Sequence, residues 1–168
     1  MKHLLLMAVL GSVPPESLVG VSYRAVTFEP NERRLFRVPQ LERVTGASGT
    51  CIEEILDAGE TETLTLQSSC AGLRTAMVWR RDASRVHLMV CAEDAERSAS
   101  LVKTRKSVQQ ALVTAKVRSA TACVRNGRVE LHGWALTAAE KKQIDAVQKR
   151  FGEVVANRVE LVEGESAE

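Results

Sequence analysis

An Asn-Gly pair at positions 126 and 127 constrains the fold of this chain more than any other feature of its sequence. The pair separates two β-type runs, 119–124 and 129–133, which are rich in Val, Thr and Leu. Asn and Gly both tolerate the positive φ that a two-residue hairpin turn requires. The sequence therefore predicts an antiparallel hairpin here, with a β-sheet as the frame of the C-terminal half.

Helices are predicted on either side of this hairpin. Thr137 and Glu140 have the spacing of a capping box, in which the hydroxyl accepts from the N3 amide and the carboxylate reaches back. Apolar residues then recur at helical spacing until Gly152, which is expected to end the helix. An earlier helix is predicted from the polar segment 93–100 through Ala115. With a last strand over 154–162, residues 100–163 are predicted to form an α-β-β-α-β domain before an acidic tail at 164–168.

The N-terminal half reads as short strands separated by turns, which favours a small β-sandwich over residues 23–92. Aromatic residues make up only 4% of the chain, so its core must consist mainly of Val, Leu, Ile and Ala, with Trp79 expected to fill the sandwich interior. Segment 52–56 fits either a strand or a single helical turn. Residues 93–100 are interpreted as a linker or helix start. Strands are predicted over 23–28, 35–38, 41–44, 61–67, 74–79 and 85–90.

The first 20 residues have the pattern of an export signal. Lys2 and His3 precede an apolar run, 4–13, which is too short to span a bilayer but matches the hydrophobic region of a secretory signal. The prolines at 14 and 15 interrupt any helix, and cleavage is expected near Gly20. The alternative is a buried N-terminal strand or helix. The export reading predicts a periplasmic protein.

Four cysteines, at 51, 70, 91 and 123, lack any Cys-x-x-Cys spacing, and the three histidines are far apart, so no zinc site is predicted. Export makes disulfides compatible with this even count, whereas a cytosolic chain would hold four separate thiols. Counting across the predicted turns brings Cys51 near Cys70, and Cys70 near Cys91. We favour Cys51–Cys70, with Cys91 and Cys123 either paired or free.

No pattern in the chain predicts chemistry. The net charge of +2 is small and its charges are scattered, which argues against a nucleic-acid partner. Neither a nucleophile elbow nor a phosphate-binding Gly-rich loop is present. Glu53 and Glu54 would point to opposite faces of a strand. We therefore predict a non-enzymatic protein with no catalytic, cofactor-binding or metal-binding residues.

The C-terminal half resembles a BON domain. The resemblance covers about residues 100–163 and rests on VRNGRVELHG at 124–133, TAAEKKQIDAVQKRFG at 137–152 and VVANRVELV at 154–162. A short connection containing Trp134 joins the hairpin to its helix, a mild departure from the family pattern. The resemblance implies a BON-like α-β-β-α-β fold.

The N-terminal half resembles the pilus assembly protein N-terminal domain, which precedes a BON domain in the outer-membrane secretins of Tad/Flp-type pilus systems. The carrying segments are VTFEPNERRLFRVP at 26–39, LERV at 41–44 and LRTAMVWRRD at 73–82. The secretin channel segment of those proteins has no counterpart in these 168 residues, so the resemblance implies no pore. The cysteines at 51, 70 and 91 are not part of the family pattern.

These resemblances imply a periplasmic accessory or scaffold protein of a pilus or secretion apparatus, with a secretin or another apparatus protein as partner. The alternative is a BON-type envelope protein that binds phospholipid and supports membrane integrity. Strand addition at 154–162 or at the edge of the 123–133 hairpin is one expected binding mode. The candidate interaction residues are Trp134, Arg128, Lys141 and Lys142, and Trp134 is the first of them to mutate because tryptophan is enriched at interface hot spots.

Overall fold

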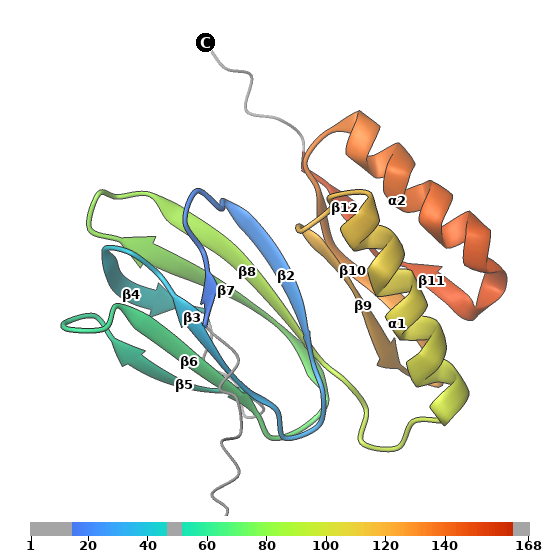
Figure 1. The fold of residues 1–168 in the computed structure, drawn as a ribbon, viewed down its shortest axis with the longest axis horizontal. Helices are drawn as coiled ribbons and strands as arrows, with labels where there is room; N and C mark the ends of the chain where they lie inside the picture. Colours follow the sequence, from blue (N-terminus) through green and yellow to red (C-terminus); the bar gives the residue numbers. More distant parts are fainter. Residues whose placement is uncertain (1–14, 47–51, 163–168) are drawn as a thin grey trace, which may run out of the picture.

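The computed structural model describes residues 15–46 and 52–162. This part of the chain is mixed and strand-rich, with three sheets and two α-helices arranged in two units (Figure 1). The mixed α and β class expected from the sequence is confirmed at this level. The first unit holds only strands, and both helices belong to the second.

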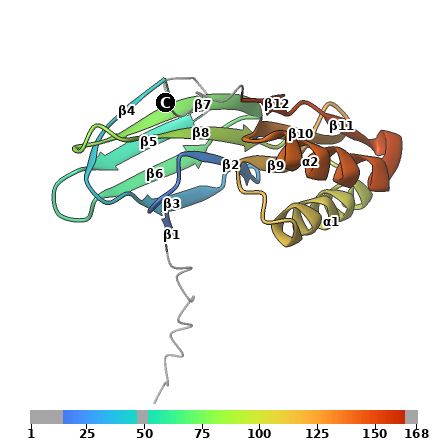
Figure 2. The ribbon, with the colours of Figure 1, turned by 90° about the horizontal axis from the view of Figure 1, so that it is seen from above.

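Two four-stranded sheets form the first unit and lie as stacked layers (Figure 2). Fully buried apolar side chains from both sheets, including Phe28, Phe36, Leu64 and Leu88, share one core between the layers. One sheet has the order β1-β3-β6-β5, from Glu16–Ser17, Arg33–Arg37, Thr63–Ser68 and Ile52–Asp57. The other has the order β2-β8-β7-β4, from Tyr23–Phe28, Arg85–Ala92, Gly72–Arg80 and Leu41–Thr45.

Alternation of side chains along the strands explains which face is buried. In β8, Val86, Leu88 and Val90 are buried in the core. The intervening His87 and Met89 remain partly exposed on the side of the sheet that points away from the core. The strands predicted from such alternation are all present, and segment 52–56 is a strand rather than a helical turn.

Trp79 was predicted to fill the core of the first unit, and this prediction is wrong. Its neighbour Val78 takes the inward position, so Trp79 lies on the outer face of its sheet. There its Nε1 donates to Thr45 Oγ1 at 3.1 Å, and its ring lies beneath the guanidinium groups of Arg43 and Arg85. A one-residue step along a strand decides between these two faces, and the sequence motif alone does not fix it.

The first unit begins before residue 23. β1 pairs in parallel with β3, and Leu18 is fully buried in the core between the sheets. Glu16 also forms an ion pair with Arg24. Residues 16–18 are therefore part of the folded unit. Cleavage near Gly20, as expected from the sequence, would remove them and disrupt this unit.

The second unit follows the order helix, strand, strand, helix, strand. It comprises α1 (Ala99–Thr114), β9 (Ala120–Arg125), β10 (Arg128–Ala135), α2 (Ala138–Phe151), the short 3-10 helix η1 (Gly152–Val154), β11 (Val155–Asn157) and β12 (Glu160–Leu161). Asn126 and Gly127 occupy the predicted turn with φ of 53° and 71°. The Thr137 hydroxyl accepts from Glu140 N at 3.0 Å, as the capping box requires.

The strand predicted over 154–162 is in fact two short strands. Both β11 and β12 pair in parallel with β10, but the ladder is interrupted between them. At the interruption, Asn157 Oδ1 accepts from Val159 N at 3.0 Å, and the Val159 side chain turns into the core. Asparagine side chains commonly form hydrogen bonds with nearby backbone groups in place of the bonds of a sheet ladder. Here this contact divides the strand.

Gly133 explains how β9 and β10 approach so closely. Its φ is 126°, and a Cβ atom at this position would lie 2.1 Å from Ser119 O. Trp134 N then donates to Ser119 O at 2.8 Å. Only glycine fits this position of the hairpin.

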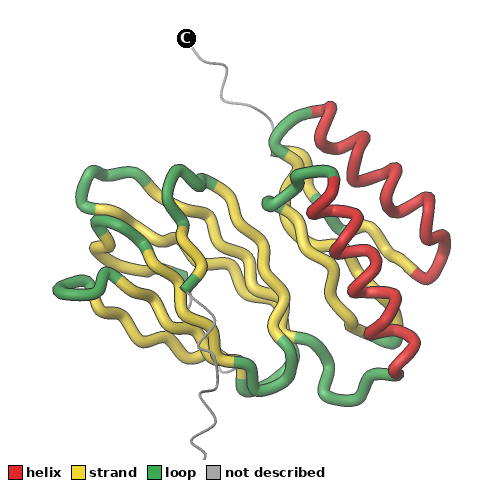
Figure 3. The backbone as a smooth tube through the Cα atoms, viewed as in Figure 1, coloured by secondary structure: helices red, strands yellow, loops and turns green. Residues whose placement is uncertain are grey.

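Both helices cover one face of the β9-β10 sheet and share with it a second apolar core. That core includes Val108, Leu112, Leu131, Ile144 and Val147. The two helices lie side by side along the outside of the second unit (Figure 3). None of the described helices is both long enough and apolar enough to cross a bilayer.

Candidate interaction surfaces

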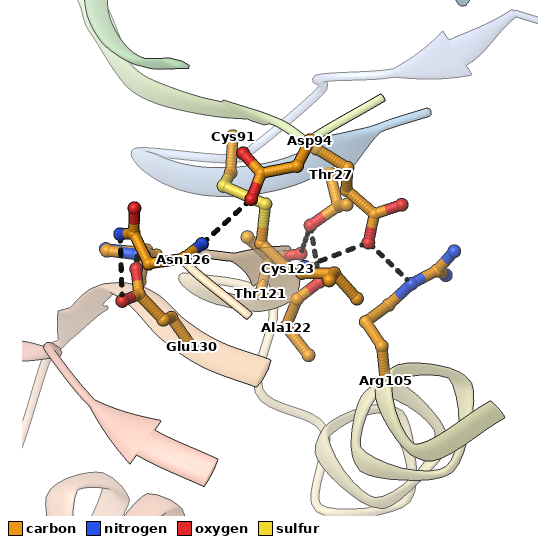
Figure 4. The surroundings of a disulfide bond; sticks show 12 residues. Thr27, Cys91, Asp94, Arg105, Thr121, Ala122, Cys123, Asn126 and Glu130 are labelled. Carbon is orange, nitrogen blue, oxygen red and sulfur yellow. Dashed lines mark hydrogen bonds and ion pairs between the residues drawn. A yellow bond between two sulfur atoms is a disulfide. The ribbon is translucent and has the colours of Figure 1, made fainter. Parts of the chain in front are cut away.

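A disulfide joins the two units. Cys91 at the end of β8 is bonded to Cys123 in β9, and both residues are fully buried (Figure 4). Of the outcomes left open by the sequence, pairing of these two cysteines is the one observed, and the alternative Cys70–Cys91 bridge is excluded. Cys51 lies outside the described residues, so the favoured Cys51–Cys70 bridge stays a prediction.

Next to the disulfide lies a buried carboxylate. Glu93 has 1% of its surface exposed and forms ion pairs with Arg97 and with Arg105, whose Nε is 2.9 Å from Glu93 Oε1. The same oxygen accepts from Val124 N in β9 at 3.0 Å. Glu93 therefore connects the linker, helix α1 and the hairpin. A buried charge is tolerated only when it is paired and hydrogen-bonded in this manner.

Polar contacts fasten the edges of β2 and β9 to each other. The Thr27 hydroxyl lies 2.7 Å from the Thr121 hydroxyl and donates to Ala122 O at 2.6 Å (Figure 4). Asp94 N donates to Val124 O at 3.2 Å, just beyond the disulfide. Together with the disulfide and Glu93, these bonds form what we term the junction. They fix the two units in one relative orientation.

Trp134 belongs to this inter-unit contact. Its ring is half-buried and meets Tyr23 edge-on at a centroid distance of 5.3 Å, while Tyr23 stacks on His87 at 4.5 Å. A cavity of about 320 Å³, bordered by Thr45, Met77 and His87 among others, lies beside the exposed part of Trp134. The residue selected from the sequence as a partner contact thus packs mainly against the first unit.

Two histidines lie near this contact, and burial lowers the pKa of each. For His87 the positive charge of Arg85 adds to the effect of burial. For His132 the nearby Glu130 opposes it, with Glu130 Oε2 2.8 Å from His132 Nε2. Burial alone would raise the pKa of Glu130, but hydrogen bonds from His132 and Asn126 lower it overall. A neutral imidazole beside an ionised carboxylate is the stable arrangement.

An open groove lies between α1 and α2, and we term it the helix groove. It has a volume of about 1090 Å³. Its apolar surface comes from Val102 and Ala111 of α1 and from Val147 and Phe151 of α2, among others. Its basic side chains are Lys103, Lys106 and Arg150, all exposed. An apolar trough with cationic edges suits a partner that is itself apolar and acidic.

Most of the positive charge on the two helices is not neutralised within the described chain. Helix α1 contains no acidic residue, and Arg105 is its only basic residue held in an ion pair. In α2 the two acids are engaged, Glu140 at the helix start and Asp145 with Lys141. The basic residues of these helices that form no ion pair with any described residue are Lys103, Lys106, Lys142, Lys149 and Arg150.

The other residues predicted to interact are not gathered in one place. Arg128 opens β10 and lies 3.5 Å from Glu130, whereas Lys141 and Lys142 lie in the first turns of α2, beyond the opposite end of β10. An eight-residue strand separates its ends by roughly 23 Å. Lys141 is paired with Asp145 at 2.6 Å. Of this set, only Lys142 is exposed and without an ion pair to the described residues.

The sequence reasoning missed both the junction and the groove. Glu93 was treated as part of a polar boundary, although the i,i+4 spacing of Glu93 and Arg97 is a signal for an ion pair. The sequence contains a weaker signal for the groove, because the amphipathic helix α1 has no acidic residue to balance its basic ones. Among the described residues there is no cluster of acids, histidines and cysteines suited to a metal ion. No protein-family model matches this chain, and no curated protein matches it either.

Proposed function

We propose that this protein is a non-enzymatic periplasmic accessory or scaffold protein of a pilus assembly or protein secretion apparatus, acting through protein–protein contacts. One observation carries the proposal. The helix groove combines an apolar surface with cationic side chains that form no ion pair within the described chain, whereas the buried Glu93 at the junction is paired with Arg97 and Arg105. The groove is thus a surface whose charges have no counter-charge among the described residues.

The resemblances support the same proposal at the level of the domains. We assign the first unit to the pilus assembly N-terminal type and the second to the BON type. The segment 124–133 that carries the BON resemblance is the β9-β10 hairpin, and 73–82 of the other resemblance includes most of β7. A secretin, or another protein of the same apparatus, is the partner this assignment favours.

The disulfide supports export. Cys91–Cys123 is buried at the junction, and disulfides persist in oxidising compartments such as the periplasm. Because Leu18 packs in the core, we place any cleavage of a leader upstream of Glu16 rather than at Gly20. N-terminal sequencing of the protein from a periplasmic fraction tests this, and a mature chain that starts after Glu16 would contradict it.

The scaffold proposal is tested by comparing tagged wild-type protein with the double variant Lys103→Glu/Lys106→Glu. Both are purified from detergent-solubilised envelopes at equal expression, and co-purifying proteins are quantified by mass spectrometry. We expect a secretin or another apparatus protein with the wild type and at least about tenfold less with the variant, a difference of 1.4 kcal/mol. Equal recovery of that protein with both would contradict the role of the groove.

A second candidate function is favoured by the same cationic edges. Anionic phospholipid headgroups attract basic residues near a membrane surface by about 1 kcal/mol each. Co-sedimentation with phosphatidylglycerol vesicles, with phosphatidylcholine vesicles as the control, distinguishes the two. The scaffold proposal predicts background binding to both. Strong binding to the anionic vesicles that Lys103→Glu/Lys106→Glu abolishes would favour the phospholipid function.

A further inference from the structure

The side of the β3-β6-β5 sheet that faces away from the core carries an ordered charge pattern. We term it the outer face and define it by the exposed residues of β3 that flank the buried Phe36 and by the residues of β6 and β5 that share their side of the sheet in the strand register. The outer face comprises Arg33, Leu35 and Arg37 of β3, Thr63, Thr65 and Gln67 of β6, and Glu53, Ile55 and Asp57 of β5. One flank is basic, the other acidic, and each has an apolar residue at its centre.

Strand register aligns these residues in three rows. The central row is Leu35, Thr65 and Ile55, which are direct neighbours across the strands. Arg33 shares a row with Glu53, and Arg37 shares one with Asp57, in each case across an intervening residue of β6. Two strand spacings, roughly 9–10 Å, separate the Cα atoms of the residues at the two ends of a row.

The outer face is unpartnered within the described chain. Leu35 is 39% exposed and Ile55 60% exposed. Arg33, Arg37 and Glu53 are exposed and form no ion pair with any described residue. In Figure 2 the second unit lies beside this sheet rather than over it.

Asp57, the remaining charged residue of the outer face, also forms no ion pair with the described residues. Its carboxylate accepts hydrogen bonds from the Thr61 hydroxyl and from Gly59 N, and these bonds lower its pKa. Asp57 is therefore ionised throughout the neutral range.

We propose that the outer face binds the outer face of a second copy of this chain. The two copies are related by a two-fold axis that runs parallel to β6, between the facing sheets. Such a rotation places β3 of one copy over β5 of the other while keeping each row in register. Arg33 then faces the other copy's Glu53, Arg37 faces Asp57 and Leu35 faces Ile55, and each pairing occurs twice. An interface of this kind is isologous and closes as a dimer.

The charge pattern selects this axis over the alternative. A two-fold axis perpendicular to the strands would place β3 over β3, so that Arg33 of one copy would face Arg37 of the other. The acidic residues of β5 would repel one another in the same way. Like charges brought together across an interface cost several kcal/mol, so only the parallel axis is compatible with the pattern.

Packing distances permit the contact. Sheets stack face to face about 10 Å apart, a gap that Leu and Ile fill at the centre and that Arg and Glu side chains span at the flanks. The face is small, so the dimer belongs with weak interfaces rather than obligate ones. Because its charged rows lie at the solvent-accessible edge, added salt weakens the attraction between them.

The test uses two double variants of the full chain. Arg33→Glu/Arg37→Glu makes the outer face wholly acidic, and Glu53→Arg/Asp57→Arg makes it wholly basic. Sedimentation velocity from about 1 to about 300 μM, a range that brackets weak association, measures the dimer. We expect the wild type to dimerise, each variant alone to be monomeric, and an equimolar mixture of the two to form the heterodimer. The variant with all four reversals should dimerise again.

Wild-type protein alone gives a second readout that does not depend on the variants folding. Raising the salt from about 50 to about 500 mM should weaken its dimer at least tenfold, since exposed charges separated by several ångströms are then screened. The control Lys103→Glu/Lys106→Glu lies outside the outer face and should dimerise like the wild type. A wild type that stays monomeric to about 300 μM, or a dimer that either double variant leaves intact, would overturn the proposal.

Discussion

The junction and the helix groove both contain clustered charges, yet they use them in opposite ways. At the junction Glu93 is 1% exposed and is surrounded by two arginines and a backbone amide. In the groove Lys103 and Lys106 are exposed and meet no acid among the described residues. Charge alone therefore does not mark a functional surface. What distinguishes the groove is positive charge without an internal counter-charge beside an apolar surface.

This difference assigns each region a role. The junction connects the two units, because a disulfide, a buried ion cluster and several hydrogen bonds all cross it. The groove remains open to a partner. Changes at the junction should therefore alter stability, whereas changes in the groove should alter binding alone.

Replacing Glu93 should have the largest effect on stability. Glu93→Ala leaves Arg97 and Arg105 without their buried counter-charge, and removing one partner of a buried ion pair costs about 3–5 kcal/mol. Urea denaturation at neutral pH measures this loss. The matched control is Glu96→Ala, an exposed acid three residues away, which should change stability by less than about 0.5 kcal/mol. Equal effects from both variants would show that the ion cluster is not structural.

Removing the disulfide should have the next largest effect. The double variant Cys91→Ala/Cys123→Ala removes a disulfide between residues 32 positions apart in the sequence. We expect the free energy of unfolding to fall by about 2–4 kcal/mol. Thermal unfolding of the variant beside the wild type measures the change. If the two unfold at the same temperature, the remaining junction contacts alone hold the units together.

Replacing Trp134 distinguishes a role in stability from a role in partner binding. Trp134→Ala removes the edge-on contact with Tyr23 and should lower stability by about 1–2 kcal/mol, because the ring is only half-buried. Partner recovery in the envelope purification should remain unchanged. A variant of wild-type stability that loses its partner would instead support the contact role predicted from the sequence.

The dependence of stability on pH should be the smallest effect. The folded pKa values of His87 and His132 are lowered, so the unfolded chain binds more protons and stability falls as pH drops below about 6.5, the ordinary pKa of histidine. Denaturation at pH 7.5 and at pH 5.5 measures the decline. His132→Gln should reduce it by removing one of the two groups. An unchanged or steeper decline in that variant would assign the effect to other residues.

Local sequence signals predicted much of the fold. The turn at Asn126 and Gly127 and the cap at Thr137 lie where their residue types require them, because both depend on interactions within a few residues. The side of the sheet taken by Trp79 was missed, since it depends on strand register and on packing against distant residues. The division of the last strand was missed although its cause, the contact between Asn157 and Val159, is local. Nothing local to Glu93 indicates that its carboxylate meets Val124 N and Arg105.

The candidate surfaces were predicted less well for the same reason. The choice of Lys142 as an interaction residue stays a prediction, and Lys103 and Lys106 line the groove only because α1 and α2 lie side by side. Trp134 was selected by residue type, and its packing against Tyr23 requires the two units to be placed relative to each other. The periodicity of apolar residues indicates which side of a single helix or strand is buried. It does not predict contacts between two units.

Site-specific photocrosslinking in living cells tests whether the helix groove binds a protein of the apparatus. A photoreactive amino acid is placed at Ala146, an exposed position lining the helix groove, and at Ala83 in the exposed β7–β8 turn as the control. We expect one discrete adduct from position 146, identified by mass spectrometry as a secretin or another apparatus protein, and lost when Lys103→Glu/Lys106→Glu is added. No protein adduct from position 146, or the same adduct from both positions, would contradict it.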